Sequence, residues 1–177
     1  MASNLAYFLK HPVTHQRPAL FTLAADGSYQ LADTDAIVNA ARACLNAKFV
    51  RGVVLSSPAV VKDFLILRLS QIPYEVFAVV FLDVRLAVIE YREMFRGTLT
   101  QAAVYPREVV KEALELNAAA VILAHQHPST GVAEPSRADE HMTQSLRSDL
   151  QLVDVRVIDH IVVAGGTTVS FAERGLL

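Results

Sequence analysis

The sequence predicts an α/β domain in which a mixed β-sheet packs between helices. Three observations carry this prediction. The chain of 177 residues is long enough for one domain with a full core, and its hydrophobic fraction of 53% argues against disorder. Helical and strand-like segments follow one another in the order helices, β-hairpin, helix, strand, helix and final strands. That order is typical of a sheet covered by helices.

The N-terminal part is expected to be an extension of the main domain. Residues 1–31 are predicted to be irregular, with prolines and a turn at Asp26-Gly27. A helix over residues 34–47 follows, and its acidic start suits the helix dipole. Residues 1–54 are too short for a separate domain by usual size rules, so we expect an extension with one helix.

The main domain is predicted to cover residues 55–177 and to begin with a helix. Ser56-Ser57-Pro58 places capping residues before a proline at the first helical position, and the helix runs to about Gln71. Two β-rich runs then form a hairpin, at 75–83 and 86–91, with a turn at Asp83–Arg85. The later elements are predicted in this order: a short strand near Thr98–Val104, an amphipathic helix from Pro106 to about Asn117, a strand over 118–125, a helix from Ser136 to about Leu150, and strands over 153–163 and 168–171.

The segment His125-Gln126-His127 carries the clearest chemical signal. Side chains two positions apart on an extended backbone point the same way, so the two imidazoles can hold one ion. Asp139 adds a carboxylate from the next element, and two His with one carboxylate are a common catalytic zinc set. Ser136-x-x-Asp139 is also a capping-box pattern, and alone it would indicate only a helix cap. The joint occurrence favours a metal site.

These segments resemble the JAMM (MPN+) metalloprotease motif, and within that superfamily they resemble the RadC branch. The resemblance covers about residues 55–177. The matching segments are Phe95-Arg96-Gly97-Thr98, Tyr105-Pro106-Arg107-Glu108, His125-Gln126-His127-Pro128-Ser129, Pro135-Ser136-Arg137-Ala138-Asp139, Asp159-His160-Ile161-Val162 and Phe171-Ala172-Glu173-Arg174-Gly175. Gln126 replaces the usual Asn, and Thr130 adds one residue to the loop. We expect the short form of the family, without the longer N-terminal region with a helix-hairpin-helix-like module that full-length RadC proteins carry.

The resemblance implies the JAB/MPN architecture, which is cytidine-deaminase-like. It implies that His125, His127 and Asp139 bind Zn²⁺, and that Ser136 donates a hydrogen bond to the oxyanion. The Ser136 hydroxyl is not expected to cap the helix and fill this role at once. A zinc deaminase itself is set aside, because that chemistry requires a pair of cysteines and Cys44 is alone.

A hydrolase of this kind also needs a general base. The resemblance implies Glu75, which opens the first strand of the hairpin. Glu93 and Glu108 are its rivals, although Glu108 also suits the start of a helix without any catalytic role.

Together these features predict a zinc-dependent metallohydrolase that cleaves a peptide or isopeptide bond. The alternative is a non-catalytic or DNA-repair-associated scaffold of the RadC family. The net charge of −2 gives nucleic-acid binding no electrostatic support, so the expected partner is a peptide or protein substrate. A homodimer through the hairpin edge is a further expectation.

The remaining residues carry weaker predictions. We expect His160 to be a hydrogen-bonded structural histidine, His141 to lie on the surface, and Cys44 to be inert packing in a helix. Residues 1–16 do not resemble a signal peptide, and no apolar run approaches the length of a membrane span. A cytoplasmic protein is therefore expected.

Overall fold

The protein divides into two compact units, Met1–Ala41 and Arg42–Leu177, which are described separately. The computed structural model describes residues 19–24, 26–48, 51–52, 54–55, 57–70, 72–97, 103–128 and 131–177. Ser56, Gln71 and Thr130 lie outside this part of the chain. So does most of the strand predicted at 98–104, and its described end, 103–104, is not a strand.

The first unit contains a β-hairpin where the sequence predicted irregular chain. Strands β1 (Phe21–Leu23) and β2 (Tyr29–Leu31) pair antiparallel. Gly27 has φ 82°, and the Asp26 carboxylate accepts a hydrogen bond from the Ser28 amide at 2.9 Å, so the predicted turn is the hairpin loop. The irregular prediction was wrong for this stretch, because a good turn between two short alternating runs suffices to pair them.

Helix α2 (Thr34–Lys48) confirms the helix predicted after the hairpin. It runs across the boundary between the two units. Cys44 on this helix is exposed, so the expectation of inert packing was wrong. Among the described residues, no helix has the length and apolar character needed to cross a membrane.

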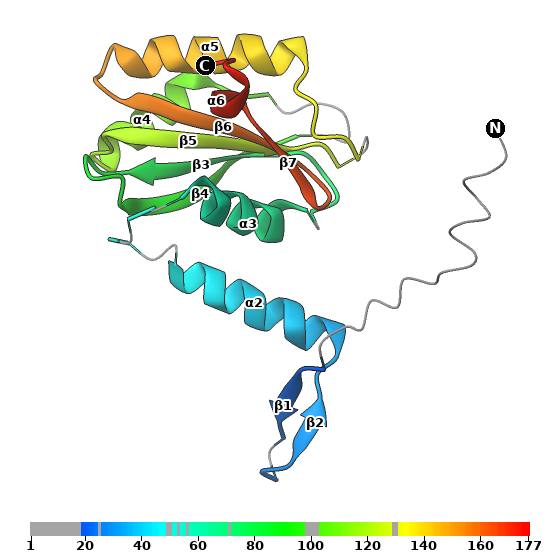
Figure 1. Ribbon diagram of the computed structural model, residues 1–177. Helices are drawn as coiled ribbons and strands as arrows, with labels where there is room; N and C mark the ends of the chain where they lie inside the picture. Colours follow the sequence, from blue (N-terminus) through cyan, green and yellow to red (C-terminus); the bar gives the residue numbers. More distant parts are fainter. Residues whose placement is uncertain are drawn as a thin grey trace, which may run out of the picture. The chain divides into compact units, whose positions relative to one another are not determined.

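The second unit is built on a five-stranded mixed sheet in the order β4-β3-β5-β6-β7 (Figure 1). Only β5 and β6 pair in parallel, and the other neighbours are antiparallel. The predicted α/β class with a mixed sheet is thus confirmed. The strands are β3 (Val76–Leu82), β4 (Val88–Arg96), β5 (Ala120–Gln126), β6 (Arg156–Ala164) and β7 (Thr167–Ser170).

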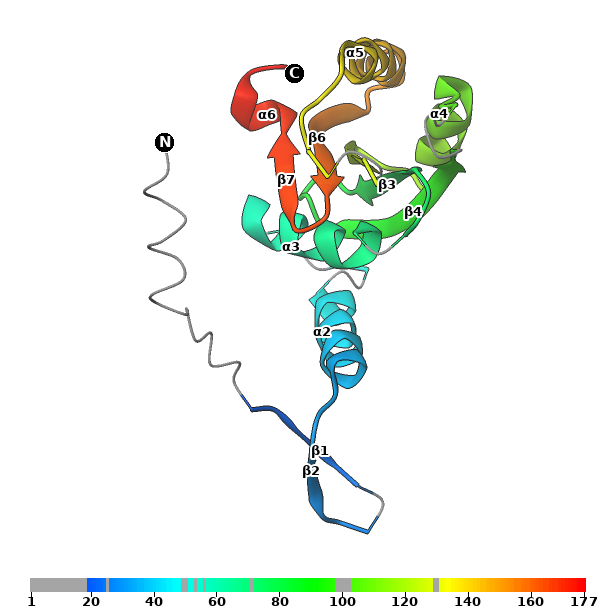
Figure 2. The ribbon, with the colours of Figure 1, turned by 90° about the vertical axis from the view of Figure 1, so that its right-hand side faces the viewer.

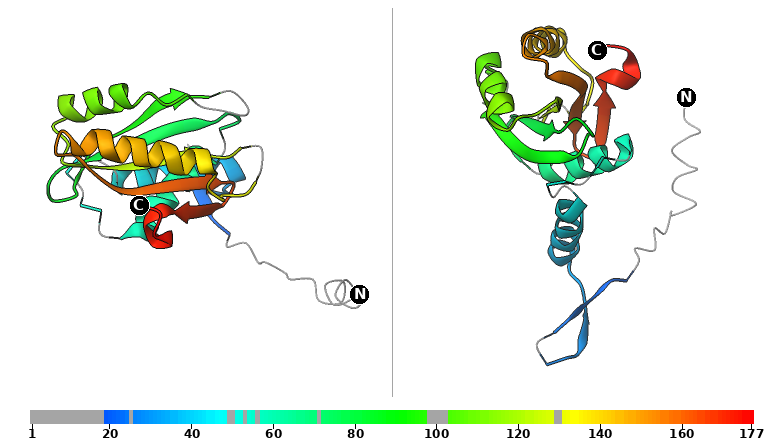
Figure 3. Two further views of the ribbon diagram at one scale, coloured as in Figure 1. Left: turned by 90° about the horizontal axis from the view of Figure 1, so that it is seen from above. Right: turned by 90° about the vertical axis from the view of Figure 1, so that its left-hand side faces the viewer.

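Helices cover both faces of this sheet (Figure 2). One face carries α3 (Pro58–Leu69), and the other carries α4 (Pro106–Glu115) and α5 (Arg137–Gln151), which lie side by side in Figure 3. A short helix, α6 (Phe171–Arg174), follows β7. The predicted hairpin and the predicted helices of this unit are confirmed, and β4 extends further than expected, to Arg96.

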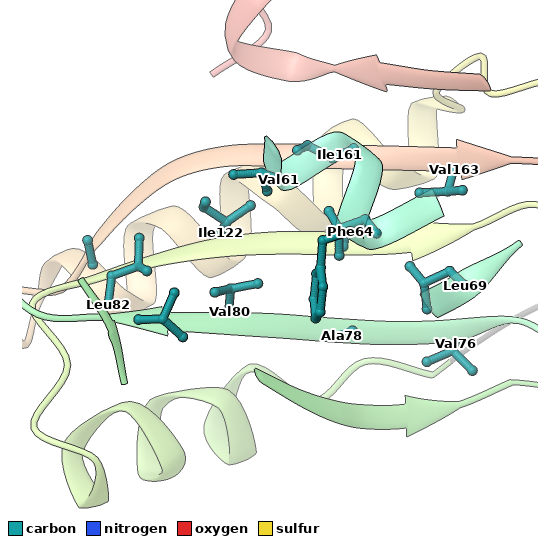
Figure 4. Packing of buried hydrophobic residues seen from close by; sticks show 14 residues of the cluster. Val61, Phe64, Leu69, Val76, Ala78, Val80, Leu82, Ile122, Ile161 and Val163 are labelled. Carbon is teal, nitrogen blue, oxygen red and sulfur yellow. The ribbon is translucent and has the colours of Figure 1, made fainter. Parts of the chain in front are cut away.

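The face under α3 is filled by aliphatic and aromatic side chains (Figure 4). Phe64 of α3 is only 1% exposed and lies over β3, where Val80 is fully buried. Phe64 also meets Tyr91 of β4 edge to face, with ring centroids 5.2 Å apart. This packing fixes β3, and β3 in turn fixes β5, the strand that carries the paired histidines.

One irregularity in the sheet matters for the site. The pairing of β5 with β6 shifts between Val121 and Ile122, so that Val121 pairs with Val157 but Ile122 pairs with Asp159. Ile158 is therefore an extra residue in β6. Beyond this bulge His160 lies beside Leu123, whose side chain packs on the α4–α5 face.

Candidate metal centre

The end of β5 delivers the two histidines. His125 lies within the strand and pairs with Phe77 on one side and Val162 on the other. His127 follows the strand, and its amide still donates to the carbonyl of Val163 at 2.8 Å, which extends the ladder past the histidine pair. His125 is 7% exposed, and the Nε2 atoms of the two rings lie 2.9 Å apart. The expected alternation of strand side chains is thus borne out.

The start of α5 delivers the carboxylate. Ser136 is the N-cap, and its Oγ accepts a hydrogen bond from the Asp139 amide at 3.2 Å. The amide and the hydroxyl of Ser136 both donate to Asp139 Oδ2, each at 2.7 Å. The capping box therefore exists, and it holds the carboxylate rigidly while Oδ1 faces His125.

Asp139 also lies close to both imidazoles, so its role in the capping box does not prevent it from facing the two histidines. Its Oδ1 lies 3.1 Å from His125 Nε2, and its Oδ2 lies 3.5 Å from His127 Nε2. One ligand atom from each of the three residues lies within 4.8 Å of the others. Donors about 2.0–2.1 Å from a tetrahedral zinc ion are about 3.3 Å from one another. These separations and this donor set fit a divalent transition metal.

One backbone contact fixes which ring nitrogen of His127 carries the hydrogen. Its Nδ1 lies 3.3 Å from the carbonyl of Val132. A carbonyl oxygen can only accept, so Nδ1 carries the hydrogen and Nε2 keeps its lone pair. This is the usual support for a metal-binding histidine.

The electrostatics of the three groups are coupled. Burial alone raises the pKa of Asp139, but the neighbouring imidazoles of His125 and His127 outweigh burial, and the pKa is held far below its usual value. The hydrogen bond with Asp139 raises the pKa of His127, against the opposing effect of burial, and the Glu75 carboxylate contributes a smaller rise. Asp139 therefore stays ionised and supplies the negative charge that a cation requires.

A second layer of polar residues lies beneath His125. His160 is fully buried, with Nε2 2.8 Å from His125 Nδ1 and Nδ1 2.6 Å from the Thr143 hydroxyl. The expectation of a hydrogen-bonded structural histidine agrees with this arrangement. Thr143 was missed, although its position four residues after Asp139 on the same helix was a usable signal.

The three candidate bases occupy different places. Glu75 directly precedes β3, is half-buried, and is the only one of the three whose charge contributes to the raised pKa of His127. Glu93 accepts a hydrogen bond from Tyr91 at 3.4 Å, and Tyr91 packs toward α3 on the other face of the sheet. Glu108 is paired with Lys111, which lowers its pKa. His141 is exposed, as expected.

The Ser136 hydroxyl is better suited to two tasks than the sequence suggested. Its cap uses an oxygen lone pair, which accepts from the Asp139 amide, while its single hydrogen points to Asp139 Oδ2. Rotation of that hydrogen toward a substrate oxygen leaves the cap intact. Capping and hydrogen-bond donation are therefore compatible.

The fold and the site define a class: an α/β domain with a His-His-Asp group that could hold a metal ion at the end of a central strand. Comparison with known proteins agrees. The family model described as RadC-like JAB domain matches residues 55–176, and the chain belongs to this family.

Named relatives extend the similarity beyond that domain. The chain is 59% identical over 151 residues to the UPF0758 protein Mpe_A2695 of Methylibium petroleiphilum, covering 85% of this chain and 68% of that protein. It is 54% identical over 158 residues to a UPF0758 protein of Leptothrix cholodnii, covering 89% of this chain and 71% of that protein.

Proposed function

We propose that this protein is a zinc-dependent hydrolase of the JAMM type that cleaves a peptide or isopeptide bond. The observation that carries the proposal is the convergence of two imidazole nitrogens and one carboxylate, with ligand atoms within 4.8 Å of one another. His125, His127 and Asp139 are the proposed ligands. Membership in the RadC-like JAB domain family supports the same chemistry.

Zinc in such a site supplies a Lewis acid that polarises a carbonyl and brings the pKa of water toward ~7. Glu75 takes a proton from the attacking water on its carboxylate and later returns it to the leaving nitrogen. Ser136 turns its hydroxyl hydrogen from Asp139 to the developing oxyanion. His125 and Asp139 are mostly buried, which keeps bulk water from competing for their donor atoms.

The substrate class follows from the proposed chemistry and the family. The reacting group is an amide carbonyl, and the partner is a peptide or a protein that carries an isopeptide-linked modifier. The cytoplasm, where a lone cysteine needs no disulfide partner, is the proposed location.

Elemental analysis of the purified protein tests the metal assignment. We expect about one zinc per chain in the wild type and a loss of zinc in His127→Ala and Asp139→Ala. His141→Ala is the matched control, because His141 is exposed and two residues from Asp139 on the same helix. Wild-type protein that holds no zinc after incubation with it would contradict the proposal.

A further inference from the structure

A chain of hydrogen bonds leads from the backbone of α5 to the imidazole of His125. The Thr143 hydroxyl lies 2.6 Å from the carbonyl oxygen of Asp139 and 2.6 Å from His160 Nδ1. His160 Nε2 lies 2.8 Å from His125 Nδ1. Every group in this chain is buried or partly buried, so water does not compete for these contacts.

The carbonyl at one end fixes the direction of each bond. A carbonyl oxygen only accepts, so the single hydroxyl hydrogen of Thr143 goes to Asp139. The hydroxyl oxygen must then accept from His160, which places the hydrogen of His160 on Nδ1. Nε2 of His160 is left as an acceptor, and His125 donates to it from Nδ1.

We propose that Thr143 and His160 form a positioning relay that holds His125 in the tautomer with hydrogen on Nδ1 and a lone pair on Nε2. The inference rests on the proposed function, since the lone pair is directed at the proposed metal position. Thr143 and His160 are positioning residues, because neither supplies a ligand atom.

Aromatic packing also fixes the orientation of the His160 ring. Phe171 stacks on His160 with centroids 4.7 Å apart and planes at 27°, and Phe77 meets it from another side at 5.9 Å. The His160 ring therefore cannot turn over to exchange its nitrogens without displacing two buried aromatic side chains.

The neighbouring carboxylate does not interfere with the ring of His160. Asp159 accepts from the His160 amide at 2.7 Å, from the Ser170 hydroxyl at 2.7 Å and from the Ala172 amide at 3.0 Å. Its oxygens are engaged with α6 and the backbone, so Thr143 remains the group that orients His160.

The relay also joins two proposed ligands. It starts at the main-chain oxygen of Asp139 and ends at His125 Nε2, which lies 3.1 Å from Asp139 Oδ1. With no hydrogen on that nitrogen, an imidazole lone pair and a carboxylate oxygen face each other. Two acceptors at this distance need a cation between them. His127 also carries its hydrogen on Nδ1 and a lone pair on Nε2, because its Nδ1 contacts the carbonyl of Val132 directly.

The tautomer is measured first, in metal-free wild-type protein. Imidazole ¹⁵N resonances at pH 8 distinguish a protonated from an unprotonated ring nitrogen. We expect His125 to carry hydrogen on Nδ1 and His160 to carry it on Nδ1. A wild-type protein with hydrogen on His125 Nε2 would overturn the relay, whether or not the protein binds zinc.

Zinc affinity is measured second, by competition with a chromogenic chelator. Thr143→Val keeps the shape but removes the hydroxyl, and we expect a zinc Kd about 10–100-fold higher than wild type. Thr143→Ser restores the hydroxyl and should stay within about threefold of wild type. Thr167→Val removes a hydroxyl that donates to the Ala164 carbonyl at 2.9 Å elsewhere in the domain, and it should leave the affinity unchanged.

The outcomes separate the two proposals. A wild type that binds no zinc contradicts the proposed function, and the ¹⁵N spectrum still decides the relay. Wild-type zinc affinity in a folded Thr143→Val protein contradicts the relay and leaves the proposed function standing. If Thr143→Val does not fold, His160→Gln, which keeps an acceptor near the former Nε2, should bind zinc more tightly than His160→Leu.

Discussion

The side-chain amide of Gln126 donates hydrogen bonds to the carbonyl of Tyr74 at 2.5 Å and to the carbonyl of Ile72 at 2.9 Å. Gln126 lies between the two histidines, is 2% exposed, and directs its side chain away from them. It thereby ties the segment before Glu75 to the strand that carries the proposed ligands. The residue that departs from the RadC-like pattern thus links the metal group to the proposed base.

Replacement of Gln126 by Leu should destabilise the domain. Two backbone carbonyls lose a buried donor, and we expect the free energy of unfolding to fall by about 1–3 kcal/mol. Urea denaturation followed by circular dichroism measures it. Gln144→Leu is the control, because exposed Gln144 donates a single bond, to Leu176 at 3.1 Å, and should change stability by less than about 0.5 kcal/mol. Equal effects of the two substitutions would mean that the hydrogen bonds of Gln126 to the two carbonyls do not stabilise the domain.

The helix cap predicts a separate stability effect at Ser136. Ser136→Ala removes the acceptor for the Asp139 amide and should lower the free energy of unfolding by about 1 kcal/mol. Ser136→Thr keeps the hydroxyl and should recover most of the loss. Thermal unfolding of the metal-free proteins reads the effect without any contribution from zinc. An alanine variant as stable as wild type would mean that the capping box adds nothing.

Glu75→Gln separates metal binding from proton transfer. The amide cannot take a proton, so we expect zinc content to stay near wild type while hydrolysis of a peptide or isopeptide substrate falls about 10²–10⁴-fold. Glu93→Gln is the matched control, since Glu93 bonds to Tyr91, whose ring packs toward the opposite face of the sheet. Full activity in the Glu75 variant would assign the proton transfer to another group.

The coupled Asp139–His127 pair predicts a pH window for stability in the metal-free protein. The lowered pKa of Asp139 gives a contribution that is present above its unfolded pKa of ~3.9 and is lost as pH falls. The raised pKa of His127 gives a contribution that is present below ~6.5 and is lost as pH rises through the folded pKa. The pair therefore stabilises most between about pH 4 and 6.5.

Chelator-treated wild type and Asp139→Asn, unfolded in urea at several pH values, measure this window. We expect the difference in unfolding free energy to be about 1–3 kcal/mol inside it and smaller at pH 8. The side-chain oxygen of Asn can still accept a hydrogen bond from the Ser136 amide, so the capping box is not the source of the difference. A difference that grows toward pH 8 would have the wrong sign for the pair.

The proposed ligands could be predicted because their arrangement is local. Strand alternation alone places His125 and His127 on one side, and the short connection to a capped helix brings Asp139 to them. The prolines at 58 and 106 likewise mark the first residues of their helices, where a missing amide hydrogen costs nothing.

The contacts that could not be predicted depend on distant pairing. The extra residue Ile158 in β6 places His160 on the same face of the sheet as His125. No local sequence pattern predicts that bulge. The bonds of Gln126 to the carbonyl oxygens of Ile72 and Tyr74 join positions more than fifty residues apart in the sequence. The hairpin β1–β2 was missed for a different reason: each strand has three residues, and most of them are exposed.

The proposed ligands and the relay residues Thr143 and His160 all lie within one strand–helix–strand unit, β5–α5–β6, in which His125 and His160 are 35 positions apart. Glu75 lies outside this unit, directly before β3, which pairs with β5 on the side away from β6. The proposed metal binding and the proposed catalysis therefore depend on different parts of the chain: a substitution at Glu75 removes the proposed base and changes none of the proposed ligands. A member of this family that has become a scaffold would be expected to keep the first and lose the second.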